Sequence, residues 1–154
     1  MATTYDTEDE LITMYAPTIL RTIKDLDKNK VERRHGCDAT KIADWLEKER
    51  KFDRIVWQFP HAGFPEENEV RGPGFEWGDD YTTKHTMLLE AFFIGAKEFL
   101  NSHGQIVITH KTIEPFSLWD IPGLAQKTGY RLFATHKFSI DQYPGYFNRR
   151  GAGK

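Results

Sequence analysis

Two histidines in this 154-residue chain follow strand-like segments, and histidine can accept or donate a proton near neutral pH. His61 lies in the stretch Phe52–Gly63, where a β-branched and aromatic run leads into a turn that Pro60 must begin. His110 ends a second apolar run, residues 105–110. Both positions correspond to the carboxyl ends of strands, where open α/β sheets bind ligands.

Two aspartates have the same relation to earlier predicted strands. Asp6 follows residues 2–5, and Asp38 follows residues 31–35. Right-handed crossovers place the carboxyl ends of parallel strands along one edge of a sheet, so these aspartates should lie on the same edge as His61 and His110. The sequence therefore predicts a functional site there, although any parallel α/β fold has polar residues at this edge.

The predicted elements alternate between strand and helix, which indicates an α/β fold with a mostly parallel sheet and helices on both faces. Thr7 and Glu10 form a capping-box pattern at the first helix, and Pro17 must kink or divide that helix. The expected strands are 2–5, 31–35, 52–59, 105–110 and 130–138; the expected helices are 7–26, 41–46, 82–100 and 118–127. Residues 63–81 are expected to form a long surface loop and residues 148–154 a flexible basic tail, within one domain.

Composition is that of a folded globular protein, with 39% hydrophobic, 29% charged and 14% aromatic residues. No apolar run approaches the roughly 20 residues that span a bilayer, and the amino terminus lacks a signal-peptide pattern. Cys37 is the single cysteine, which favours a reducing compartment and no internal disulfide. Six histidines occur without metal-ligand spacing, so no metal site is predicted.

Basic residues are concentrated toward the carboxyl end, although the net charge is −2. Residues 51–80 contain three basic and seven acidic side chains, whereas residues 81–154 contain nine basic and five acidic ones. Arg149 and Arg150 could therefore contact phosphates of a nucleic acid. The alternative is a solvated terminus without a binding role.

Five motifs, in order, resemble the 25S ribosomal RNA (uridine-N3)-methyltransferase-like domain family, including its plant members. The most specific are His-Gly-Cys-Asp-Ala-Thr at residues 35–40 and Phe-Pro-His-Ala-Gly at residues 59–63. The others occupy residues 108–111, 115–119 and 143–151. The resemblance covers almost the whole chain and implies a Rossmann-like methyltransferase that uses S-adenosylmethionine and acts on ribosomal RNA, in the nucleolus or cytoplasm.

The same resemblance implies roles for the residues on the cofactor side. Asp6 would bind the ribose hydroxyls of S-adenosylmethionine, and Asp38, with Ala39 beside it, would lie at the adenine. Carboxylate oxygens can accept hydrogen bonds from hydroxyls or an exocyclic amine. The structural alternatives are an Asp6 charge favouring the dipole of the first helix and an Asp38 cap on the next helix.

On the substrate side, the resemblance places Phe59, Pro60 and His61 at the target base. His61 would orient a uracil or accept its N3 proton, and Phe59 would pack against base or cofactor. A capped structural histidine and a core aromatic remain the alternatives. His110 and Lys111 could contact a phosphate or the methionine carboxylate, or could be solvated strand ends.

Two parts of the family pattern have no counterpart in this sequence. The glycine-rich segment after the family's first strand is missing, and so is the last strand, so the sheet is expected to be incomplete at both ends. A row of unpaired backbone groups should then lie between the family's second and fourth strands. A shortened gene product, a degenerate relative, and a fragment that needs another chain all remain open. The function classes are thus an RNA methyltransferase and a non-catalytic remnant or binding module; without a Gly-x-Ser-x-Gly elbow, a hydrolase is disfavoured.

Overall fold

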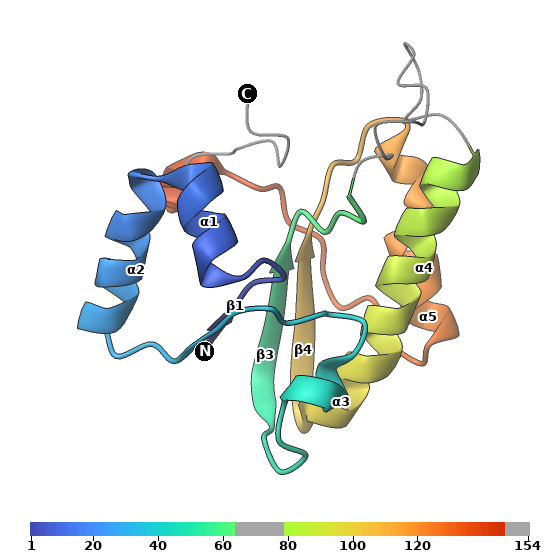
Figure 1. Cartoon of the computed structure of the whole chain (residues 1–154). Coiled ribbons are helices and arrows are strands. Elements are labelled where there is room, and N and C mark those ends of the chain that lie inside the picture. Colours follow the sequence, from blue (N-terminus) through green and yellow to red (C-terminus); the bar gives the residue numbers. More distant parts are fainter. Residues whose placement is uncertain (64–78, 147–154) are drawn as a thin grey trace.

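The computed structural model describes residues 1–63 and 79–146 and has an α/β arrangement (Figure 1). The strands are β1 (Ala2–Thr3), β2 (Arg33–Arg34), β3 (Phe52–Gln58) and β4 (Leu100–Thr109). The α-helices are α1 (Glu8–Tyr15), α2 (Thr18–Lys28), α3 (Ile42–Trp45), α4 (Asp79–Ala96) and α5 (Ile121–Lys127), and short 3-10 helices span Lys97–Phe99, Phe116–Trp119 and Ile140–Gln142.

The first helical region follows its sequence signals. Thr7 caps α1, and both hydrogen bonds of the capping box with Glu10 are present. Pro17 divides the region as predicted, because α1 ends at Tyr15 and α2 begins at Thr18. A proline lacks an N–H and disfavours helical geometry in the residue before it, so a continuous helix cannot pass through this position.

Within the described residues, the strands form two separate parallel pairs. β1 pairs with β2, and β3 pairs with β4, with Gln58 opposite Thr109 at the carboxyl end of the second pair. The parallel α/β prediction is confirmed, but a single continuous sheet is not present. The break lies between β1 and β3, the two strands between which the family resemblance predicted a row of unpaired backbone groups.

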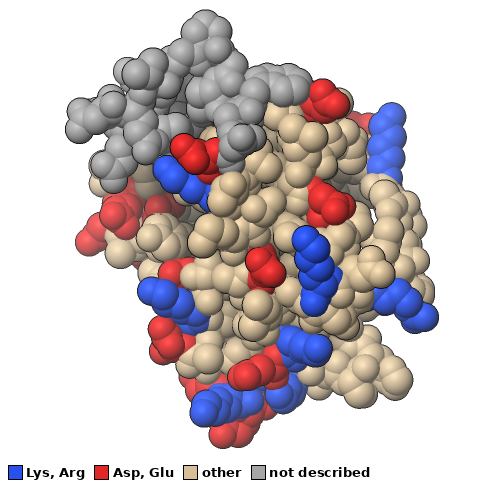
Figure 2. Space-filling model, turned by 90° about the vertical axis from the view of Figure 1, so that its right-hand side faces the viewer, with Lys and Arg blue, Asp and Glu red and all other residues tan. Residues whose placement is uncertain are grey.

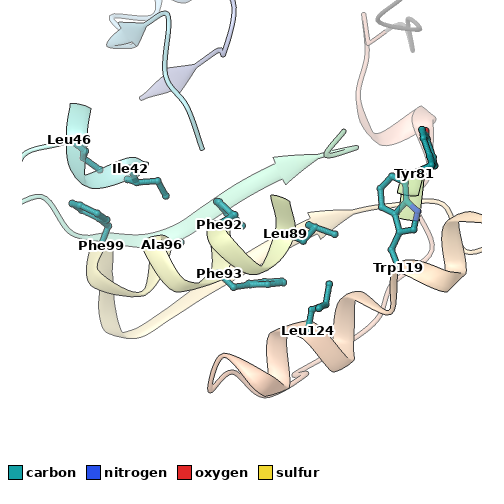
Figure 3. Packing of buried hydrophobic residues seen from close by; sticks show 10 residues of the cluster. All are labelled: Ile42, Leu46, Tyr81, Leu89, Phe92, Phe93, Ala96, Phe99, Trp119 and Leu124. Carbon is teal, nitrogen blue, oxygen red and sulfur yellow. The ribbon is translucent and has the colours of Figure 1, made fainter. Parts of the chain in front are cut away.

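The core lies where α4 packs on one face of the β3–β4 pair (Figure 3). The helix predicted at residues 82–100 is confirmed as α4, and its apolar residues, which recur at helical spacing, face the core, with Leu89 and Ala96 completely buried. Trp57 of β3 meets Phe92 edge to face, with 4.6 Å between ring centroids. Figure 3 shows how α3 and α5 contribute further side chains to this core, among them Ile42, Leu46 and Leu124.

Within residues 1–63 and 79–146, the predicted helix cover is found on the face of the β3–β4 pair that packs against α4. The second face of this pair keeps Val56 56% exposed and Val107 40% exposed. The reason is the placement of α1 and α2, which lie beside β1 on the far side of β3 from β4 (Figure 1). Successive strand residues point to opposite faces, so Ile55 and Trp57 contact the core while Val56 between them does not.

The strand predicted at residues 130–138 is not formed. Tyr130, at the start of this segment, is anchored by a 2.8 Å hydrogen bond from its hydroxyl to the carbonyl of Phe93. Leu132 is 62% exposed, Phe133 is 79% exposed, and Ala134 and His136 are exposed as well. Alternating side chains favour a strand, but a strand also needs a neighbouring strand for its backbone groups, and within residues 1–63 and 79–146 no strand pairs with this segment.

Other boundaries differ by a few residues from the sequence expectation. Helix α4 begins at Asp79, so the last three residues of the predicted 63–81 loop are helical. Strand β4 begins at Leu100, because Leu100 pairs with Phe52 before a bulge shifts the register to Arg54 and Gln105. The rest of that loop after Gly63, and the predicted tail at 148–154, lie outside the described residues.

We expect Leu89→Ala to destabilise the protein by about 2–5 kcal/mol, because it leaves a cavity at a fully buried position. Urea unfolding followed by circular dichroism would measure this change. Met87→Ala in the same helix is the control, since Met87 is 64% exposed. Equal losses for the two variants would contradict the assignment of the core face of α4.

Hydrogen exchange should alternate along β3. The Phe59 N–H donates to the Thr109 carbonyl at 2.8 Å. Because backbone groups alternate in direction along a strand, the backbone N–H and C=O groups of Ile55 and Trp57 also point toward β4, and those of Val56 and Gln58 point away from it. We expect the amides of Val56 and Gln58 to exchange faster than those of Ile55 and Trp57 in NMR-detected exchange. Uniform protection along the strand would show that another segment covers this edge.

Candidate functional site

The turn after β3 is held in an unusual backbone conformation. Phe59 has a φ of 52°, a left-handed value that is rare for a bulky residue, and Pro60 after it is buried. Such conformations cost on the order of 1–3 kcal/mol and cluster at functional sites. The turn carries His61 to the carboxyl end of β3, beside the end of β4.

Phe59 also belongs to a group of aromatic rings that joins this turn to the later part of the chain. Its ring meets Phe138 edge to face at 5.6 Å between centroids. Phe138 in turn stacks on Tyr143 at 5.2 Å, with an interplanar angle of 14°. Tyr143 is 42% exposed, so the group presents a ring edge to solvent.

Five side chains gather at the ends of β3 and β4 and are called here the imidazole–tryptophan cluster: His61, Tyr81, His85, His110 and Trp119. The Trp119 indole is at its centre and is 1% exposed. His85 stacks on the indole at 4.0 Å between centroids, and His110 lies against it in a tilted orientation at 4.4 Å. His61 lies 4.5 Å from His85 by the same measure.

Hydrogen bonds fix the ring orientations of the three histidines. The Gly63 N–H donates to His61 Nδ1 at 3.0 Å, and His61 Nε2 lies 2.8 Å from the Tyr81 hydroxyl. His85 Nδ1 bonds the Tyr81 carbonyl at 2.7 Å, one helical turn earlier. His110 Nε2 bonds the Phe116 carbonyl at 3.1 Å. Each histidine thus has one ring nitrogen matched to a backbone group.

Burial keeps these imidazoles uncharged at neutral pH. It lowers the pKa of His85 to about 4. The hydrogen bond to the Tyr81 carbonyl acts in the opposite direction and raises this pKa, whereas the charges of His61 and His110 lower it slightly further. Burial is also the largest cause that lowers the pKa of His61 and of His110, and the positive charge of Lys111 adds to it in both. A neutral imidazole can accept a proton, which a charged one cannot.

The two predicted site residues after β4, His110 and Lys111, differ in their exposure to solvent. His110 is half-buried in the cluster, so it is not a solvated strand end. Lys111 is exposed and places its ammonium nitrogen 4.0 Å from the centroid of the Phe116 ring, a cation–π contact. Arg149 and Arg150 lie outside the described residues, and their contact with phosphates stays a prediction.

Asp6 and Asp38 lie together at the ends of β1 and β2, apart from the cluster. The Gly36 N–H donates to the Asp6 carbonyl at 3.2 Å, and the Asp6 carboxylate has no hydrogen bond within the described residues. The Asp38 carboxylate accepts from both the amide and the hydroxyl of Thr40, at 2.8 and 2.7 Å. The Thr40 hydroxyl bond is the main cause that lowers the pKa of Asp38.

Ala39 is half-buried and packs against the core cluster. Between this aspartate group and the imidazole–tryptophan cluster, no hydrogen bond or ring contact occurs within residues 1–63 and 79–146. The structure therefore brings His61 and His110 together, as predicted, but places Asp6 and Asp38 in a second group on the other strand pair.

Sequence reasoning missed Tyr81, His85 and Trp119 as parts of the site. A signal was present for His85, because Tyr81, His85 and Leu89 follow each other at intervals of four on the apolar stripe of α4. A histidine on a core-facing stripe needs a polar partner or a function. Trp119 gave no such signal, because its position depends on how the segment after β4 folds back.

Two polar atoms of the cluster remain without a partner in the described structure, His85 Nε2 and Trp119 Nε1. The described residues contain no group of three or more His, Cys, Asp or Glu side chains that could hold a metal ion. Among the helices of the described part, none is long and apolar enough to cross a membrane.

Figure 2 shows the face of the molecule that forms the right-hand side of Figure 1. Basic and acidic side chains alternate on it, and they do not gather into a basic patch.

The family model described as rRNA (uridine-N3-)-methyltransferase BTM5-like, the BMT5-like family, matches residues 1–150. The chain belongs to the BMT5-like family, a family of rRNA methyltransferases.

Three curated proteins illustrate its relatives. An uncharacterized Arabidopsis thaliana protein is 36% identical over 99% of this chain and 70% of its own length. The heavy metal-associated isoprenylated plant protein 41 of Arabidopsis thaliana is 34% identical over 99% of this chain. The ferredoxin-fold anticodon-binding domain-containing protein 1 homolog of Mus musculus is 28% identical over 84% of this chain. The chain spans only 28% and 21% of those two proteins. No solved structure matches significantly.

The titration of His85 should make stability depend on pH. Its pKa is about 4 in the folded chain and 6.5 for an ordinary imidazole, so the unfolded chain takes up the proton first as the pH falls. The contribution of neutral His85 is complete above about pH 6.5 and is lost between pH 6.5 and 4. Between pH 6.5 and 4, the unaltered chain should therefore lose more unfolding free energy than the His85→Phe variant, by up to about 3 kcal/mol. Denaturant titration at each pH would measure this difference.

The control for this experiment is His103→Gln, because His103 is exposed in β4 and outside the cluster. It should leave the pH dependence of stability as it is in the unaltered chain. If His85→Phe left that dependence unchanged too, the buried neutral state of His85 would not contribute to stability.

Proposed function

We propose that this chain acts as an S-adenosylmethionine-dependent RNA methyltransferase that methylates N3 of a uridine in large-subunit ribosomal RNA. Membership of the BMT5-like family supports the class of reaction. The observation that carries the proposal to particular residues is the Phe59–His61 turn, whose left-handed Phe59 places His61 beside His110 at neighbouring strand ends.

Methyl transfer from a sulfonium is an in-line displacement, and correct positioning of the two reactants supplies much of the rate. A target uracil next to the turn would meet Phe59 as an apolar wall and His61 as an orienting group. Pro60 would hold the turn rigid, because its ring fixes φ and it is buried. His110 and Lys111 would face the same base from the end of β4.

For the fold, we propose that the two strand pairs are parts of one Rossmann-like sheet. Both pairs are parallel. The backbone N–H and C=O groups of Val56 and Gln58 that point away from β4 have no backbone partner in the described part of the chain. A further parallel strand between β1 and β3 would satisfy them and would cover exposed Val56. Such a strand would also place Asp6 and His61 along one edge.

For the cofactor, the proposal assigns Asp6, Asp38 and Ala39 to S-adenosylmethionine. Asp6 supports this best, since its carboxylate is half-buried and has no hydrogen bond within the described residues. Asp38 keeps one carboxylate oxygen on Thr40, which leaves its second oxygen, 4.0 Å from the Lys41 ammonium, for a ligand. When bound, the cofactor supplies the electrophilic methyl group.

The alternative is a non-catalytic member of the family that binds RNA or another chain. Two observations favour it: the sheet is divided between β1 and β3, and Asp38 already has a structural partner in Thr40. A nucleolar or cytoplasmic location and ribosomal RNA as the partner are proposed for either case, on the strength of the family.

Calorimetric titration with S-adenosylmethionine separates the two cases. The enzyme proposal expects saturable binding and methylation of a uridine-containing rRNA fragment, detected as N3-methyluridine by mass spectrometry. If Asp6 accepts the ribose hydroxyls, Asp6→Asn should weaken cofactor binding by about 10- to 100-fold, as expected when a charged hydrogen-bond acceptor is lost.

Asp9→Asn is the matched control, because Asp9 is an exposed aspartate in the first turn of α1. It removes the same charge three residues away and should leave affinity unchanged. An absence of any cofactor binding by the unaltered chain would favour the non-catalytic alternative, and equal effects of both variants would exclude a specific role for Asp6.

A further inference from the structure

The three histidines of the imidazole–tryptophan cluster differ in whether their unprotonated ring nitrogen is available. Methylation of uridine N3 requires that N3 lose its proton, so one group must accept it. A neutral imidazole has a single lone pair for this purpose, on the nitrogen that carries no hydrogen. The backbone partners of each ring establish which nitrogen that is.

His61 has its lone pair on Nδ1, because the Gly63 N–H can only donate. That lone pair is engaged at 3.0 Å, and the Nε2–H is left to donate to the Tyr81 hydroxyl at 2.8 Å. Protonation of Nδ1 would require the Gly63 bond to break. His61 is thus better arranged to orient a base than to accept its proton.

His85 has its lone pair on Nε2, because its Nδ1–H donates to the Tyr81 carbonyl. This nitrogen has no partner, yet the side chain is 0% exposed and stacks on Trp119 at 4.0 Å. A nucleobase in solution cannot reach it without opening the core. His85 therefore serves the packing of the cluster.

His110 differs from both. Its Nε2–H donates to the Phe116 carbonyl at 3.1 Å, so the lone pair lies on Nδ1, which has no hydrogen bond within the described residues. The ring is half-buried and lies against the Trp119 indole, with 4.4 Å between ring centroids and a tilt of 34° between the ring planes. Its strand position follows Thr109, which is opposite Gln58, so it lies level with the Phe59–His61 turn.

We propose that Nδ1 of His110 is the general base that accepts the N3 proton of the target uridine, with the Phe116 carbonyl holding the required tautomer. This assignment rests on the proposed methyltransferase function. His61 is then a positioning residue. The Lys111 ammonium, next along the chain, stabilises the negative charge that develops on the uracil as the proton leaves.

The step balances as follows. The N3 proton moves to His110 Nδ1, and the electron pair it leaves on N3 attacks the methyl carbon of the sulfonium donor. The bond between that carbon and sulfur breaks, and its electrons go to sulfur, giving a neutral thioether. The imidazolium of His110 returns its proton to water. Burial and, to a smaller extent, the charge of Lys111 lower the pKa of His110, which favours the neutral ring that can accept a proton.

The test uses the full chain, S-adenosylmethionine and a uridine-containing rRNA fragment under single-turnover conditions. We expect His110→Ala to slow methyl transfer by about 10²- to 10⁴-fold, the usual contribution of a general base. Added imidazole should restore part of the rate of His110→Ala, which a purely structural role would not permit. His103→Gln is the control and should keep the rate of the unaltered chain.

Nitrogen-15 NMR of the histidine rings tests the tautomer without any activity. We expect His110 to show a protonated Nε2 and an unprotonated Nδ1 above its pKa; the opposite tautomer overturns the proposal even if His110→Ala fails to fold. An active chain whose His110→Ala variant keeps full rate overturns the assignment of the base alone. A chain that neither binds the donor nor methylates RNA overturns the methyltransferase function as well.

Discussion

The parallel ladder between β3 and β4, packed on one face by α4, is the constraint on which the candidate site depends. Its register places Gln58 opposite Thr109, so both strands end at the same level. The Phe59–His61 turn and His110 are therefore neighbours although about fifty residues separate them in the chain. A slip of one residue would turn Ile55 and Trp57 away from the core, so burial of these side chains maintains the geometry of the site.

Around this ladder, a buried indole organises three imidazoles. Trp119 stacks on His85 and contacts His110 at a tilt, and the burial of these imidazoles lowers the pKa of both. Backbone groups then select the tautomers: a carbonyl for His85 and His110, and an N–H for His61. Chemical function in this cluster thus follows from packing, because solvent access and the backbone partner decide which lone pair can react.

The β1–β2 pair carries the residues that we propose for the methyl donor. Asp6 and Asp38 follow the carboxyl ends of its two strands. The donor side and the base side of the proposed reaction thus belong to different strand pairs. In the described part of the chain, the backbone groups of Val56 and Gln58 that point away from β4 have no partner. A strand that hydrogen-bonds to these groups would fix how the two strand pairs are placed relative to each other.

The sequence by itself determined the local features: the Thr7 capping box, the division at Pro17, the stripe of α4, and the presence of histidines after two strands. These follow from propensities and periodicities within a few residues. It did not determine that 130–138 lacks a strand or that Asp38 is held by Thr40. Tertiary structure decided these, because a strand needs a partner across space. It also decided that His110, rather than His61, has the available lone pair, since that depends on which backbone group each ring meets.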